Sequence, residues 1–126
     1  MESIEAKKLI AGIQKSLVEE GVDSEDVVES LKKLREYAIE EKDPTVTRVL
    51  RMCYEHIEEF VSFNVGMPID EEDEEEEAEM LVEGISAQAN SLYYLMELLR
   101  NSRNERNREE IIFYRDALKR YWQANF

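Results

Sequence analysis

The chain has 126 residues, of which 43% are apolar and 37% are charged, and its formal net charge is −14. This length fits one domain of ordinary size, and the negative charge repels nucleic acid and anionic membranes on average. Only four glycines and two prolines interrupt the chain, and no segment alternates apolar and polar residues for long, so we expect helices and no sheet.

Membrane and secretory segments are not expected. No apolar run approaches the roughly 20 residues that a bilayer-spanning helix needs. The first residues, MESIEAKK, lack the basic start and apolar core of a signal peptide. Cys53 is the only cysteine, so no internal disulfide can form, as is usual in a reducing compartment. We therefore expect a cytoplasmic protein.

The first two predicted helices cover about residues 3–20 and 25–41. Apolar residues recur in each at the spacing of one helical face. Gly21 tolerates a positive φ and should end the first helix. Either Asp23 or Ser24 can cap the N-terminus of the second.

The third predicted helix follows a break at Lys42-Asp43-Pro44. Asp43 can act as the N-cap, and Pro44 suits the first helical position because its missing N–H is not needed there. We expect this helix to reach about Asn64 and to end at Gly66. An acidic linker over about residues 66–74 should follow, because a block of like charges repels itself.

The fourth predicted helix should be long and central, from about Glu74 to Arg100–Asn101. Its apolar residues recur at alternating spacings of four and three, which is typical of a helix that packs along its whole length. They are Ala78, Val82, Ile85, Ala89, Leu92, Met96 and Leu99.

A fifth helix should run to about Gln123 after a short turn, capped by Ser102 or Asn107, each with a glutamate three residues later. A single helix continuous with the fourth is the alternative. The sequence thus predicts an all-α, single-domain bundle of four to five antiparallel helices over residues 1–126.

A metal-dependent enzyme is one alternative function. Glu71, Glu72 and Glu75 have a spacing that can hold magnesium, with Glu83 as a further ligand, and would suit a nucleotide phosphohydrolase. However, any run of eight acids contains this spacing, and no following helix offers a matching glutamate–aspartate pair. We expect no catalytic residue, metal or cofactor.

The only histidine, His56, lies three residues after Cys53, so the two could share a helix face. Cys53 belongs to the apolar face of the third helix, where a small buried residue is common. We expect His56 to lie at the boundary or on the surface, and we expect no nucleophilic chemistry from the pair.

The C-terminal segment combines arginines with aromatic residues, types enriched at protein interfaces. It carries seven basic and four acidic residues, so it is positive within an acidic protein. We interpret the chain as a non-enzymatic protein–protein interaction module, a homodimer or a small adaptor. Nucleic-acid contact through the same arginines is the other alternative. We expect instead that these arginines pair with acidic residues of the protein itself. The predicted contact residues are Arg100, Arg103, Arg106, Arg108, Tyr121 and Trp122.

Overall fold

The computed structural model describes residues 1–68 and 82–126, and the rest of this section concerns these residues. They form a bundle of five α-helices without strands, which confirms the predicted all-α fold class. The helices are α1 (Ile4–Glu19), α2 (Glu25–Glu40), α3 (Pro44–Phe60), α5 (Ala87–Arg100) and α6 (Glu105–Ala124).

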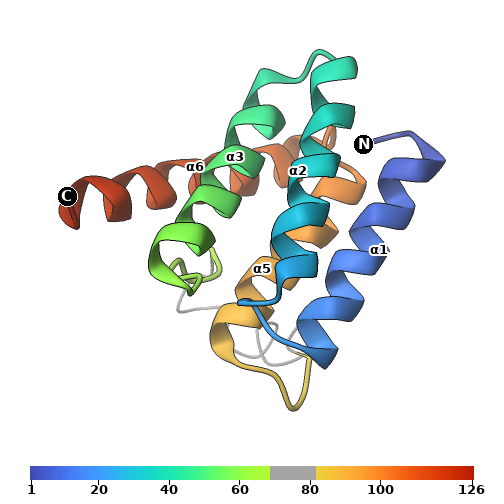
Figure 1. The fold of residues 1–126 in the computed structure, drawn as a ribbon. Helices are drawn as coiled ribbons and strands as arrows, with labels where there is room; N and C mark the ends of the chain where they lie inside the picture. Colours follow the sequence, from blue (N-terminus) through green and yellow to red (C-terminus); the bar gives the residue numbers. More distant parts are fainter. Residues whose placement is uncertain (69–81) are drawn as a thin grey trace.

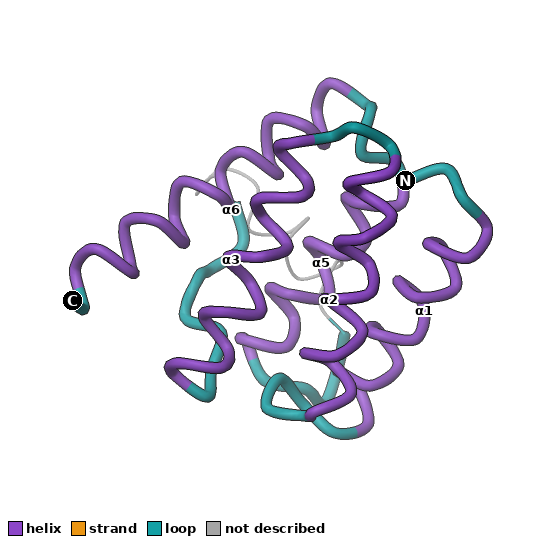
Figure 2. The backbone as a smooth tube through the Cα atoms, turned by 45° about the horizontal axis from the view of Figure 1, so that its top comes forward, coloured by secondary structure: helices purple, strands orange, loops and turns teal. Residues whose placement is uncertain are grey.

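The five helices pack mainly in a closed ring. The neighbours in order are α1, α2, α3, α6 and α5, and α5 returns to α1. Figure 1 shows α1, α2 and α3 side by side, joined by short turns, whereas α6 runs crosswise to α3. The C-terminal end of α6 projects beyond the other helices, which the second view also shows (Figure 2). The last turns of α6 therefore extend past the rest of the bundle.

The core lies inside this ring and draws on every helix. Four of the residues predicted for the fourth helix, Ala89, Leu92, Met96 and Leu99, are buried, whereas Val82 and Ile85 are half-buried. The largest buried side chain, Tyr114 of α6, donates from its hydroxyl to the backbone oxygen of Ser91 at 2.8 Å. Fully burying an aliphatic or aromatic side chain contributes about 1.5–3 kcal/mol, so this shared core explains why the helices associate.

Most predicted helix starts are confirmed by their caps. Ser24 accepts from the backbone N–H of Asp26, and Asp43 accepts from that of Val46. The predicted short turn before α6 is confirmed, but its predicted caps are wrong, because Asn104 caps the helix. The two predicted caps have other partners: Ser102 accepts from the amino group of Met1, and Asn107 donates to the backbone oxygen of Asn101.

The predicted end of the third helix is wrong. Helix α3 ends at Phe60, because Val61 adopts a left-handed conformation with φ 52°. The chain turns back there, and Phe63 becomes fully buried in the core. The backbone N–H of Asn64 then donates to His56 Nε2 at 3.1 Å. Tertiary contacts thus end this helix before Gly66.

The predicted fourth helix is too long at its N-terminal end. Residues 82–86 are not helical: Gly84 has φ 85°, and Ser86 caps α5, which is only 14 residues long. The side chain of Asn90 bonds both backbone groups of Val82, at 2.8 and 3.2 Å, and so fixes a turn. Glu74, Ala78 and most of the predicted acidic linker lie outside the described residues.

None of the helices in residues 1–68 and 82–126 combines the length and the apolar composition that a bilayer-spanning helix requires.

Candidate interaction site

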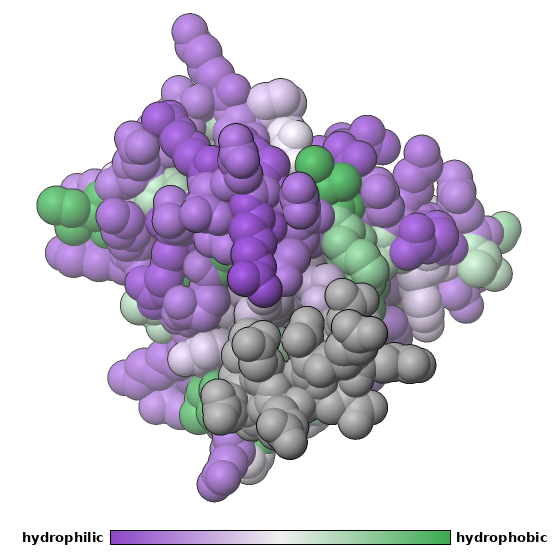
Figure 3. All heavy atoms as spheres, turned by 180° about the vertical axis from the view of Figure 1, so that it is seen from behind, coloured by the Kyte–Doolittle hydropathy of each residue, from purple (hydrophilic) through white to green (hydrophobic). Residues whose placement is uncertain are grey.

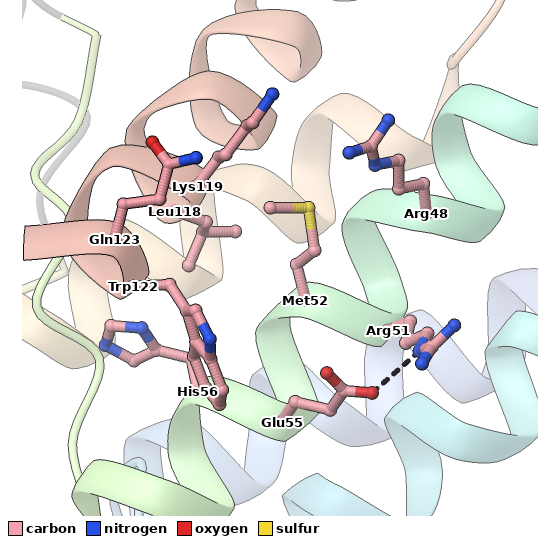
Figure 4. Close-up of a pocket in the computed structure, with 9 residues that line it drawn as sticks. All are labelled: Arg48, Arg51, Met52, Glu55, His56, Leu118, Lys119, Trp122 and Gln123. Atoms are coloured by element: carbon pink, nitrogen blue, oxygen red, sulfur yellow. Dashed lines mark hydrogen bonds and ion pairs between the residues drawn. The ribbon is translucent and has the colours of Figure 1, made fainter. Parts of the chain in front are cut away.

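A groove of about 310 Å³ lies between α3 and α6 (Figure 4). The groove forms where α3 and α6 cross, between the solvent-facing sides of the two helices. Helix α3 supplies five of the lining residues and α6 supplies four. They are Arg48, Arg51, Met52, Glu55, His56, Leu118, Lys119, Trp122 and Gln123.

The chemical character of the groove changes along its length. Figure 4 shows Arg48 at one end, Met52 and Leu118 in the middle, and His56 beside Trp122 at the other end. On α3 the three residues 48, 52 and 56 are spaced by four, so they share one face of the helix. The groove therefore has a cationic end, an apolar middle and an aromatic end.

Positive charge is in excess around the groove. Arg48, Arg51 and Lys119 face a single acid among the lining residues, Glu55. Arg51 Nε donates to Glu55 Oε1 at 2.7 Å, which leaves the charges of Arg48 and Lys119 to attract an outside group. The lining of the groove therefore carries a net positive charge, although the whole protein has a net charge of −14.

His56 is buried in the inner wall of the groove, with only 1% of its surface exposed, so the predicted boundary position is wrong. Its ring packs against Phe60, Phe63 and Tyr121 at centroid distances of 4.8, 5.8 and 4.9 Å. The spacing gave a signal for this, because residue 56 lies one turn beyond the buried Cys53.

The hydrogen bonds of His56 define its tautomer. Nε2 accepts from the backbone N–H of Asn64, and the side-chain amide of the same residue lies 3.4 Å away. Burial lowers the pKa of His56 to about 4, so the ring is neutral near pH 7. The remaining proton is then on Nδ1, which is buried and has no hydrogen-bond partner among the described residues.

Aromatic side chains form a partly exposed cluster beside His56. Trp122 stacks on Phe126 at 4.7 Å and packs edge-on against Phe60 at 5.8 Å. Trp122 is 36% exposed and Phe126 70% exposed. Seen from behind the view of Figure 1, the coloured part of the surface is mainly hydrophilic, with separated apolar spots (Figure 3). Apolar surface next to a groove is a common feature of binding sites.

The predicted arginines lie around the turn between α5 and α6, and most of them bond to groups of the protein itself. Arg100 donates to Gln14 and Glu97, and Arg103 pairs with Glu2 at 3.1 Å. Arg108 forms a bidentate ion pair with Asp43, in which Nη1 and Nη2 donate to the two carboxylate oxygens at 3.1 and 2.8 Å. Arg106 is exposed.

The six predicted contact residues therefore do not form one surface. Arg108 and Trp122 are fourteen residues apart on the same helix, which corresponds to about 20 Å. Tyr121 and Trp122 belong to the α3–α6 groove region, whereas the arginines surround the turn between α5 and α6. The basic residues of the groove, Arg48, Arg51 and Lys119, were not among the predicted contacts, because only the packing of α3 on α6 brings them together.

The metal and nucleophile alternatives gain no support from the described part of the chain. Glu71, Glu72 and Glu75 lie outside it, and Glu83 is exposed in the turn before α5. The described residues contain no cluster of three potential metal ligands. Cys53 is fully buried, and this burial raises the pKa of its thiol, which keeps it protonated.

No protein-family model, curated protein or solved structure matches this chain.

Proposed function

We propose that the protein is a non-enzymatic interaction module that binds an acidic, amphipathic segment of a partner protein in the groove between α3 and α6. One observation carries this proposal: a groove with positive side chains and an apolar middle lies beside exposed aromatic residues on a protein of net charge −14. Glutamates or aspartates of the partner would face Arg48 and Lys119, and its apolar side chains would cover Met52 and Leu118.

The partner's apolar side chains would contribute most of the affinity. Trp122, near the C-terminal end of α6, offers a large exposed contact area, and tryptophan is enriched among residues that dominate binding energy. The exposed charges of the groove would mainly speed association and select against basic partners.

The sole tryptophan provides a direct test, because Trp122 lines the groove. The full-length chain is titrated with a helical peptide that carries glutamates and leucines on one face, and tryptophan fluorescence is recorded. We expect a saturable change. The same peptide with lysine in place of glutamate should cause no change in fluorescence. If the glutamate peptide also caused no change, the proposal would be contradicted.

Two matched charge reversals locate the contact. Arg48→Glu in the groove should weaken binding of the acidic peptide several-fold, because it replaces attraction by repulsion. Arg106→Glu makes the same change of charge on the exposed start of α6 and should leave the affinity unaltered. If Arg106→Glu weakened binding as much as Arg48→Glu, the groove would not be the contact surface.

Light scattering separates this occupant from a second copy of the chain. We expect a monomer at concentrations where the acidic peptide saturates the groove. A dimer that dissociates on substitution of Trp122 by alanine would instead assign the groove to self-association and would overturn the proposed partner.

A further inference from the structure

One polar group in the lining of the groove has no hydrogen-bond partner among residues 1–68 and 82–126. His56 Nδ1 is buried, and the structure shows no acceptor for it among the described residues. Buried polar groups in folded proteins are nearly always hydrogen-bonded, so a buried donor without a partner in the wall of a groove indicates where a ligand atom belongs. This observation is independent of the charges at the other end of the groove.

The donor character of this atom follows from its surroundings. Two groups of Asn64, the backbone N–H and the side-chain amide, lie 3.1 and 3.4 Å from Nε2. A nitrogen that accepts cannot also carry the proton of a neutral imidazole, so the proton is on Nδ1. The group that completes this end of the groove must therefore be a hydrogen-bond acceptor.

Two exposed side chains lie at the same end of the groove as His56. Figure 4 shows Trp122 and Gln123 from α6 near the imidazole, and both are exposed. They lie at the end of α6 that projects beyond the bundle (Figure 1). Nδ1 is itself buried, so a ligand group reaches it only when side chains at this end of the groove move aside.

Resting on the proposed function, we propose that the partner segment places an acceptor oxygen on His56 Nδ1–H while an acidic residue further along the same segment pairs with Arg48 and Lys119. His56 and Arg48 are eight residues apart on α3, a rise of about 12 Å. A partner helix beside α3 spans this distance with an acid at position i, an apolar residue at i+4 and a glutamine, asparagine or acid at i+8.

This arrangement distinguishes the partner from any other acidic helix. The apolar residue at i+4 covers Met52 and Leu118, which lie between the two polar ends (Figure 4). An aliphatic side chain at i+8 would leave the imidazole N–H without a partner, and groups built to hydrogen-bond discriminate strongly against ligands that lack the matching atom. The buried imidazole thus acts as a specificity determinant.

Nitrogen NMR of the single histidine tests the inference without a mutation. The full-length chain, labelled with ¹⁵N, should show a protonated Nδ1 and an unprotonated Nε2 near pH 7. Addition of a peptide with glutamate, leucine and glutamine at i, i+4 and i+8 should shift the Nδ1 signal and slow exchange of its proton. The control peptide carries leucine at i+8.

A cross-comparison of protein and peptide gives the affinity effect. Glutamine to leucine at i+8 should weaken binding to the natural chain by about three- to tenfold, as expected for one hydrogen bond. The same change should have no effect on His56→Phe, which keeps an aromatic ring and removes the donor. If His56→Phe does not fold, the NMR shifts on the natural chain remain decisive.

The outcomes separate this inference from the proposed function. A fluorescence change without any shift of Nδ1 would leave the groove as a binding surface and overturn the role of His56. A proton on Nε2 in the free protein would also overturn it. Absence of both the fluorescence and the NMR response would contradict the proposed function itself.

Discussion

The single histidine, His56, is a buried side chain whose protonation affects the stability of the folded protein. His56 is neutral in the folded protein, because burial lowers its pKa to about 4 from an ordinary value of 6.5. Its Nε2 accepts a hydrogen bond from Asn64, and a proton on that nitrogen would break the bond. Folding therefore favours the uncharged ring.

This side chain predicts a loss of stability on mild acidification. Between pH 6.5 and pH 4 the unfolded chain binds a proton at His56 and the folded chain does not, so the free energy of unfolding falls as the pH falls. We expect a decrease of about 1–2 kcal/mol from pH 7 to pH 5, measured by urea unfolding. His56→Gln, an acceptor that does not titrate, should have a flatter profile. Equal profiles for both chains would contradict the prediction.

At the scale of the element, the end of α3 illustrates a helix stopped by an unfavourable residue. Val61 has φ 52°, a region that β-branched side chains rarely adopt, and 67% of its surface is exposed. Its side chain therefore contributes little burial that would offset the strained backbone. The strain is tolerated because the residues that follow, Phe63 and Asn64, make buried contacts.

Replacing this valine by glycine should stabilise the protein. A left-handed conformation costs a non-glycine residue about 1–2 kcal/mol, and part of this gain is lost to the greater freedom of glycine in the unfolded chain. We expect Val61→Gly to raise the free energy of unfolding by about 0.5–1 kcal/mol in urea titrations.

Val18→Gly is the matched control, because Val18 is 45% exposed in the last turn of α1 and has no positive φ. It should lower the free energy of unfolding by about 0.5–1 kcal/mol. A decrease for both variants would show that Val61 is not strained.

Local sequence patterns predicted which helices form better than they predicted the residues at which the helices begin and end. Side-chain caps such as Asp43 act on neighbouring residues, so the sequence reveals them. By contrast, the apolar spacing at Val82 and Ile85 continues through residues that are not helical, because Asn90 holds a turn there through tertiary hydrogen bonds. The groove was not predictable in the same way. It depends on the crossing of α3 and α6, although the sequence did single out Trp122.

At the scale of the whole molecule, the net charge of −14 and the positive groove should respond to salt in opposite directions. Raising NaCl from about 0.01 M to about 0.15 M shortens the Debye length from about 30 Å to about 8 Å. Screening reduces repulsion among the many acids, so the free energy of unfolding should rise. The same screening weakens attraction between the groove and an acidic peptide, so affinity measured by Trp122 fluorescence should fall several-fold.

Arg48→Glu, which adds negative charge and removes the attraction, should gain more stability from salt and lose less affinity. If salt changed stability and affinity in the same direction, the groove would not be an electrostatic exception on this protein.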